Sequence, residues 1–199
     1  LLVLPALFPE SEEDSKGIFV LDYIATVLPF ANVKVFTIQL YGRQKGIFKE
    51  NFGGIEVHRL IVSDKKPSNL PQKLLLYIKW FKASVGYAKN ICEGVDLIHV
   101  HNSTLYGNLA FELNKKFNIP YVITEHSGPF SKISGNIINR IFAKRAWKKC
   151  SALLAVSEDL KLQIREAGMN PPEIIVTYNP VNTNLFVPLQ EMVSSKIII

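Results

Sequence analysis

The sequence has 199 residues, of which 48% are hydrophobic and 20% charged. This composition excludes a disordered chain, and no apolar run reaches the roughly 18 residues needed to cross a bilayer. The net charge of +6 favours anionic partners, such as nucleotide phosphates or lipid head groups. The two cysteines, Cys92 and Cys150, follow no metal-ligand or disulfide spacing, which favours a reducing, cytoplasmic setting.

Along the chain, apolar runs typical of strands alternate with segments of helical period. Residues 1–4 form a short continuous apolar run, as a strand buried on both faces does. Two β-branched strands follow a helix, and a loop containing Gly53 and Gly54 joins them. In chain order the pattern predicts strands at 1–4, 33–40, 55–62, 95–100, 120–126, 152–156 and 173–178, and helices at 18–29, around 74–88, and at 105–117, 136–149 and 158–167.

Two helices carry further signals. In the helix around residues 74–88, apolar side chains recur at spacings of four and three, so they line one face: Leu74, Ile78, Phe81, Val85 and Ala88. The helix at 158–167 begins after Ser157, which is placed to cap it, and ends at Gly168.

Regular strand–helix alternation predicts an α/β fold, with a Rossmann-like parallel sheet and helices on both faces. We expect one domain over residues 1–180 and a proline-containing linker over 181–195. The last residues, 196–199, resemble the start of another buried strand and predict a second domain beyond it. Both ends of the sequence therefore have the character of boundaries within a longer protein.

Ligands of open parallel sheets bind at the carboxyl ends of the strands. His99 and His101 lie on the same side of one predicted strand, because side chains alternate. His101 is at the carboxyl end, followed by Asn102, and a core role and a ligand role are equally open for it. His99 lies one layer deeper, and we expect a hydrogen-bonded core histidine.

Glu125 and His126 end the next strand, and Ser127 begins a sharp turn. A neutral imidazole at His126 can donate a hydrogen bond to a sugar hydroxyl or accept one. Glu125 can accept one itself or orient the histidine. Lys16 and Gly17 begin a helix, where free N–H groups suit a phosphate, although a single glycine also fits an ordinary helix start.

A basic stripe runs along the helix at 136–149. Arg140, Lys144 and Lys148 recur every four residues, with Trp147 beside them. The stripe is either a solvated face or a contact for an anionic bilayer, which Trp80, Lys79 and Lys82 would extend. Nucleic acid is not expected as a partner, because no recognition-helix, RNP-type or zinc motif accompanies the charge.

Five stretches together resemble glycosyltransferase family 4 from end to end. They are KGIF, DLIHVHN, IPYVITEHSG, ALLAVSEDLKLQIREAG and IIVTYNPVNTNLFVP. Three positions depart from the family pattern: Lys16 stands where the opening turn often has a second glycine, Pro180 replaces a glycine, and Asn182 replaces an aspartate. The last two lie in the segment that leads out of the domain.

The resemblance implies a GT-B enzyme of two Rossmann-like domains, of which this chain is the N-terminal, acceptor-side one. It implies sugar transfer from a nucleotide-sugar with retention of configuration, without a cofactor or an obligatory metal. The glutamate pair and the diphosphate clamp belong to the second domain, so we expect this chain alone to be folded but inactive. The TEHSG stretch favours bacterial polysaccharide or lipid-linked glycan synthesis.

The resemblance also implies residue roles. His126 matches the histidine that lines the donor sugar and is the catalytic candidate, with Glu125, Ser127 and Asn102 as further sugar contacts. His101 lies on the acceptor side, and the Lys16–Gly17 turn approaches the donor phosphates. The implied partners are the nucleotide-sugar and a glycan or lipid-linked acceptor, with an anionic membrane surface as a further candidate.

Two other functions stay open. His99 and His101, with Glu125 and His126 on the next strand, form a set that can in principle bind zinc in a metal-dependent hydrolase. Alternatively, the domain is a non-catalytic Rossmann-like binding module.

Overall fold

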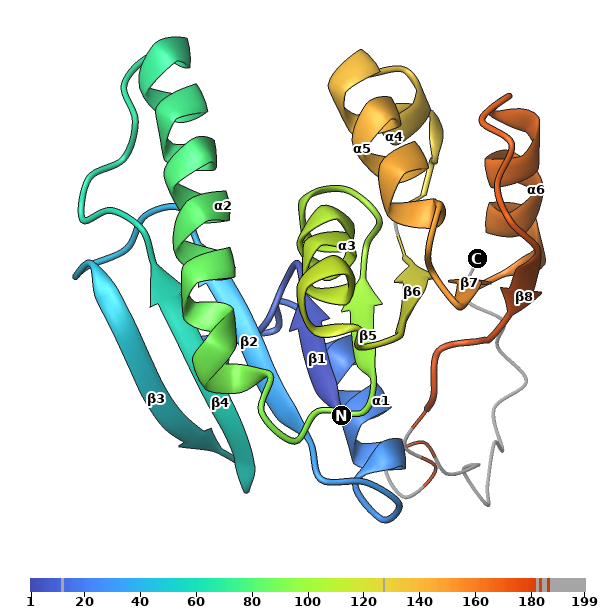
Figure 1. Cartoon of the computed structure of the whole chain (residues 1–199). Helices are drawn as coiled ribbons and strands as arrows, with labels where there is room; N and C mark the ends of the chain where they lie inside the picture. The colour runs from blue at the N-terminus through green and yellow to red at the C-terminus, as the bar shows by residue number, and fades with distance from the viewer. Residues whose placement is uncertain (12, 127, 182, 184–185, 187–199) are drawn as a thin grey trace, which may run out of the picture.

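A computed structural model describes residues 1–199 except 12, 127, 182, 184–185 and 187–199. Its centre is an eight-stranded sheet with the order β3-β4-β2-β1-β5-β6-β7-β8 (Figure 1). Every strand pair is parallel except β3–β4. The strands are β1 Leu2–Pro5, β2 Lys34–Gln39, β3 Gly46–Phe52, β4 Ile55–Ile61, β5 Ile98–His101, β6 Tyr121–Glu125, β7 Ala152–Ala155 and β8 Ile174–Val176.

Helices follow most of the parallel strands and run back along the sheet (Figure 1). Within the described part of the chain, none is long and apolar enough to cross a membrane. The helices are α1 Ile18–Val27, α2 Leu70–Ile91, α3 Leu105–Phe117, α4 Ser131–Ser134, α5 Ile137–Trp147 and α6 Glu158–Glu166.

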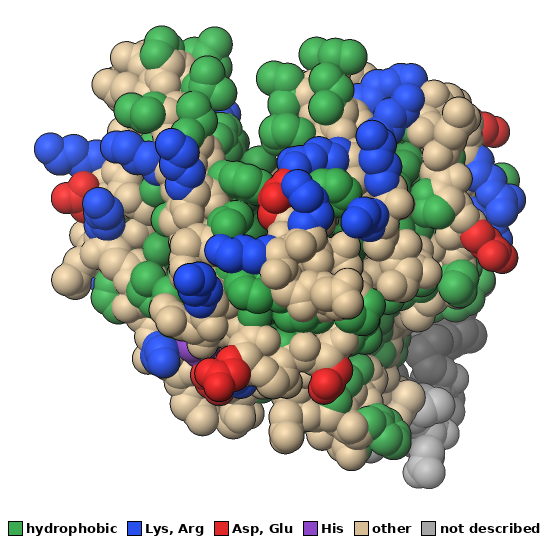
Figure 2. Space-filling view, in the orientation of Figure 1, with side chains coloured by type: hydrophobic (Ala, Val, Ile, Leu, Met, Phe, Trp, Pro, Cys, Tyr) green, Lys and Arg blue, Asp and Glu red, His purple; other side chains and the backbone are tan. Residues whose placement is uncertain are grey.

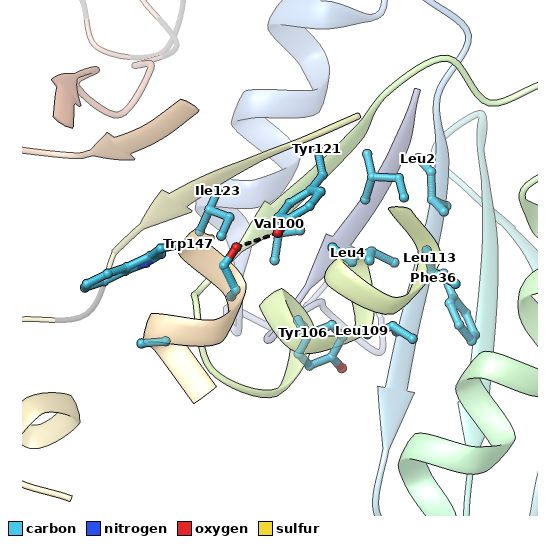
Figure 3. Close-up of a cluster of buried hydrophobic side chains, with 14 of the residues drawn as sticks. Leu2, Leu4, Phe36, Val100, Tyr106, Leu109, Leu113, Tyr121, Ile123 and Trp147 are labelled. Carbon is cyan, nitrogen blue, oxygen red and sulfur yellow. Dashed lines mark hydrogen bonds between the residues drawn. The ribbon is translucent and has the colours of Figure 1, made fainter. Parts of the chain in front are cut away.

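The sheet separates two apolar cores. Leu2 and Leu4 point into the larger core, which α2, α3 and α5 cover, whereas Val3 points into the smaller one beneath α1. In the larger core, aliphatic and aromatic side chains of the central strands pack against Leu109 and Leu113 of α3 (Figure 3). The fold class predicted from the sequence, with helices on both faces, is confirmed.

Strand β3 is a difference from the prediction, which had a loop there. Gly53 and Gly54 occupy positive φ (57° and 87°) and are the two-residue turn of a β3–β4 hairpin. Positive φ at both central residues is the type I′ geometry that matches the twist of a hairpin. Strand β3 mixes Ile47, Phe48 and Phe52 with charged residues and buries none of its side chains, so it forms no continuous apolar run, but the Gly–Gly pair marks its end.

The apolar face predicted for α2 is also wrong in phase. The buried stripe is Leu76, Trp80, Ser84, Ala88 and Ile91. Of the predicted face only Ala88 is buried, while Leu74 and Ile78 are exposed. Three consecutive leucines at 74–76 support two alternative stripes, and packing against the sheet selects the one through Leu76.

Side-chain caps fix the starts of three helices. Asn69 accepts a hydrogen bond from Gln72 N at the start of α2, and Asn136 accepts two at the start of α5. The predicted Ser157 cap is confirmed by its bond from Leu160 N (3.1 Å). The predicted linker at 181–195 and second-domain start at 196–199 lie mostly outside the described residues.

Candidate functional site

Three imidazoles from β5 and the end of β6 stack into one group, which we call the histidine column: His99, His101 and His126. Ring centroids are 4.4 Å apart between His99 and His101 and 5.0 Å between His101 and His126. Strand alternation places the first two on one face, and the parallel register sets His101 opposite Thr124. His126, two residues after Thr124, then reaches the same face.

Helix α1 covers this column with two aromatic rings. Phe19 lies 4.4 Å from His126 between ring centroids, and Tyr23 meets all three imidazoles edge-on at 5.6–6.0 Å. The Tyr23 hydroxyl donates toward the carbonyls of Thr177 and Tyr178 (3.2 and 3.4 Å). Neither ring was predicted as part of the site, although their i,i+4 spacing directly after the Gly17 turn places both on one face of α1.

Hydrogen bonds link the column to itself and to β6. His99 Nε2 lies 2.7 Å from Thr124 Oγ1, which confirms His99 as a hydrogen-bonded core histidine. His101 Nδ1 lies 2.8 Å from His126 Nε2. Of the other nitrogens of this pair, His101 Nε2 is buried without a hydrogen-bond partner among the described residues, whereas the Asn179 side chain lies close enough to His126 to act as a hydrogen-bond partner that raises its pKa against burial. His101 lies at the carboxyl end of β5, as predicted, but it is only 2% exposed because α1 covers this edge of the sheet.

The column is neutral at physiological pH. Burial lowers the pKa of His99 and of His126 to about 4. Burial, reinforced by the two neighbouring imidazoles, also holds the pKa of His101 well below its usual value. In a neutral pair one imidazole donates and the other accepts. If His101 donates from Nδ1, His126 carries its proton on Nδ1; in the reverse arrangement, His126 Nδ1 is an acceptor.

Glu125 lies on the opposite face of the sheet, because it is out of phase with Thr124 and His126. Its Oε1 accepts a hydrogen bond from Ser103 N (2.8 Å), and its Oε2 has no partner among the described residues. Burial raises the pKa of this fully buried carboxyl group to about 7, against the lowering effect of Ser103. The expectation that Glu125 orients His126 is therefore corrected: it holds the start of the β5–α3 loop.

The Lys16–Gly17 turn lies beside the column, at the start of α1. Gly17 has φ +73°, and a Cβ there would lie 2.3 Å from the carbonyl oxygen of Leu7. The glycine is therefore required by the chain's own β1–α1 loop, whatever ligand approaches it. Asp14 ties the same loop by accepting bonds from Glu10 N and Lys16 N (3.1 and 3.0 Å), and these bonds lower its pKa. The Lys16 side chain is exposed.

Comparison with known proteins identifies the family. A family model for Glycosyltransferase Family 4 matches residues 22–185. The chain belongs to glycosyltransferase family 4. An uncharacterized glycosyltransferase of Methanocaldococcus jannaschii is 34% identical over 99 residues, which make up 49% of this chain and 28% of that protein. The match therefore spans under a third of the relative's length.

Solved structures confirm a GT-B type of Rossmann-like fold. Sucrose-phosphate synthase from Thermosynechococcus elongatus aligns with a TM-score of 0.61 at 17% identity, over 92% of this chain and 90% of that one. A trehalose-6-phosphate structure from E. coli with UDP-2-fluoro glucose aligns with a TM-score of 0.62 at 11% identity, over 92% and 50%. Anabaena HepE in complex with UDP and glucose aligns with a TM-score of 0.54 at 16% identity, over 93% and 46%.

Two further sugar contacts were predicted in this family 4 domain, Asn102 and Ser127. Asn102 has φ +93°, and its Oδ1 accepts bonds from Thr104 N and Thr104 Oγ1 (3.1 and 2.9 Å), so its side chain folds back onto its own loop. Ser127 lies outside the described residues. Across the described residues, no group of three or more His, Cys, Asp or Glu side chains converges as metal ligands would. In the zinc set proposed from sequence, His101 and His126 instead face each other nitrogen to nitrogen.

The basic stripe needs one correction. Trp147 is buried: its Nε1 donates to Ser103 Oγ (2.8 Å) and its ring stacks on Phe130. Trp80 is buried too, so neither indole is available to a membrane. Arg140 reaches the carbonyl of Gly168 (3.0 Å). The exposed cations of the stripe are Lys144 and Lys148.

Proposed function

We propose that this chain is the N-terminal, acceptor-side domain of an enzyme that transfers a sugar from a nucleotide-sugar to a glycan or lipid-linked acceptor. The observation that carries the proposal is the neutral His101–His126 pair under Phe19 and Tyr23 of α1, in which His101 Nε2 has no hydrogen-bond partner among the described residues. The UDP and sugar ligands named for the E. coli and Anabaena structures support the donor class. We place the enzyme in bacterial polysaccharide or lipid-linked glycan synthesis, at the cytoplasmic face of the membrane.

In this proposal His126 is the catalytic residue. Loss of a nucleoside diphosphate develops positive charge on the sugar ring, and a neutral imidazole contacts a ring hydroxyl without repelling that charge. His126 Nδ1 is buried in this structure, so a sugar hydroxyl reaches it only if the side chains that cover it move. The two tautomeric arrangements of the pair then let Nδ1 either donate to the hydroxyl or accept from it. His101 sets that choice through the 2.8 Å bond and acts as a positioning residue.

The division of labour between domains follows from the same proposal. Residues 1–180 bind the acceptor and contribute His126, and the proposal requires a second domain. That domain holds the nucleotide and supplies the charged groups for the diphosphate. Closure of two domains excludes water and aligns an acceptor hydroxyl with the anomeric carbon. Transfer retains the anomeric configuration and requires no obligatory metal, and this chain alone is inactive because it cannot close.

The test compares variants in the full-length enzyme, assayed by release of nucleoside diphosphate. His126→Ala should lower kcat by about 100-fold, the usual effect of removing a transition-state hydrogen bond. His126→Asn keeps a short polar group near the position of Nδ1 and should recover part of the loss.

The matched control is His58→Gln. His58 is also a buried histidine, but it lies in β4 and bonds to Tyr87 and Glu56, away from the column. The His58→Gln variant should leave kcat unchanged. Equal losses in the His58 and His126 variants, or full activity in His126→Ala, would contradict the assignment. Stoichiometric zinc in the purified enzyme would favour the hydrolase alternative instead.

A further inference from the structure

The first turns of α2 and α5 expose large aliphatic side chains at the same end of the domain. Both helices begin at the edge where the parallel strands end, and both project beyond it (Figure 1). In the space-filling view, hydrophobic atoms gather at the tips of both projections (Figure 2). Each of these side chains is 50–77% exposed, and together we call them the apolar prongs: Leu70, Leu74 and Leu75 of α2, and Ile137, Ile138 and Ile141 of α5.

Positive charge accompanies the prongs and negative charge is absent from them. Residues 65–92 and 126–157 each contain six Lys or Arg residues and no Asp or Glu. These two segments hold the prongs and 12 of the chain's 23 basic residues. Basic side chains lie in a band below the apolar tips, with a few acidic side chains among them (Figure 2).

A groove of about 780 Å³ separates the two prongs. Its walls are largely apolar and include Phe81 of α2, Leu105 of α3 and Phe142 of α5. Lys82 and Arg145 also line it. The apolar surface therefore continues from the tips into the space between them, with Lys82 on one side and Arg145, which is ion-paired with Glu112, on the other.

The prongs belong to well-formed helices. Asn69 and Asn136 cap α2 and α5 through backbone N–H groups, which holds each helix in shape up to its first turn. The buried stripe of α2 is anchored by Trp80 and Ile91, while its start overhangs the sheet. The aliphatic tips are thus presented by rigid elements and do not depend on folding against a partner.

We propose that this end of the domain docks on an anionic lipid bilayer, with the apolar prongs inserted at the head-group boundary and the basic band on the lipid phosphates. Aliphatic tips backed by cations are the arrangement of interfacial helices, and each Lys or Arg near an anionic surface adds attraction. A second copy of the chain fits less well, because its own basic band would meet an identical one. Nucleic acid has no use for the aliphatic tips. The inference extends the proposed function and rests on it only for the lipid-linked acceptor.

Vesicle cosedimentation of the full-length enzyme tests the apolar part, because in the isolated chain a surface that faces the proposed second domain would be exposed as well. Vesicles of phosphatidylcholine with phosphatidylglycerol should bind the enzyme, and vesicles of phosphatidylcholine alone should bind it weakly. Leu74→Gln combined with Ile138→Gln should weaken binding by about 10-fold or more, because both side chains leave the acyl boundary. The control Phe30→Gln alters an 88% exposed aromatic ring outside both segments and should change nothing.

The charge part has its own pair of variants. Lys144→Gln with Lys148→Gln should weaken binding to anionic vesicles by about 30-fold, from about 5-fold for each of the two charges lost. The control Lys116→Gln alters an exposed lysine of α3 outside both segments and should have little effect.

Three outcomes overturn the proposal: no binding to either vesicle, binding that the prong variants leave unchanged, or a stable dimer that the prong variants dissociate. The assay needs no nucleotide-sugar, so it separates the two proposals. Vesicle binding without sugar transfer by the full-length enzyme would remove the proposed function and leave this docking surface intact.

Discussion

Glu125 offers the sharpest prediction, because a fully buried carboxyl group with one unpartnered oxygen is costly to ionise. Burial raises its pKa from 4.5 to about 7. The folded protein therefore keeps the proton over a range in which the unfolded chain has released it. In this range stability falls as pH rises, and the loss is complete once pH exceeds the folded pKa.

Glu125→Gln preserves shape and the acceptor for Ser103 N but cannot ionise. The unfolding free energy of the variant minus that of the parent should grow by about 2.5 kcal/mol from about pH 5 to about pH 8.5. This value follows from the pKa of 4.5 in the unfolded chain and of about 7 in the folded protein. At the acidic end the two proteins should differ little, since the parent then carries a neutral carboxylic acid.

Urea unfolding monitored by tryptophan fluorescence at a series of pH values measures this difference. Glu166→Gln, on the exposed end of α6, is the matched control and should stay within about 0.5 kcal/mol of the parent at every pH. A Glu125→Gln difference that does not change with pH would refute the reasoning, because it would mean that the carboxylate is not desolvated in the folded state.

Three other perturbations follow from the structure. Gly17→Ala should lower the unfolding free energy in urea by at least about 3 kcal/mol, because the new Cβ meets the Leu7 carbonyl. The control Gly94→Ala has a similar positive φ but open space around it and should cost about 1 kcal/mol. Equal losses would show that the contact at Gly17 is relieved. Trp147→Phe removes the indole donor to Ser103 Oγ and should lower stability by about 1–2 kcal/mol; no loss in thermal unfolding would mean that the bond is dispensable. In the Glu125→Gln background, acidification from pH 6.5 toward pH 4 should destabilise the protein by at least about 3 kcal/mol. Burial lowers the pKa of His99 and His126 to about 4, so over this range it is mainly the unfolded chain that gains protons. A flat pH profile of stability would contradict this.

The alternation of strands and helices was sufficient to predict the fold class and to bring His99, His101 and His126 together, because period-2 side-chain alternation and parallel register are local rules. The same alternation, applied one residue further, already places Glu125 on the other face. The sequence therefore already predicts that Glu125 and His126 lie on opposite faces of the sheet, although we expected them to act together.

Exposure was harder to predict than position. Whether His101 is open or covered depends on where α1 lies, and α1 lies over it because the Gly17 turn sends Phe19 and Tyr23 back across the sheet. The burial of Trp147 also depends on a tertiary contact. Its spacing suits a basic surface stripe, but Ser103 provides a buried acceptor for its indole N–H. Both outcomes depend on tertiary contacts between elements far apart in the sequence.

The hydroxyl of Tyr23 has a mechanical consequence. It clasps the backbone just after β8 while its ring presses on the imidazoles, so one side chain joins the strand exit to the histidine pair. The position of the backbone at Thr177 and Tyr178 is therefore coupled, through a single phenol, to α1 and to the two imidazoles beneath it.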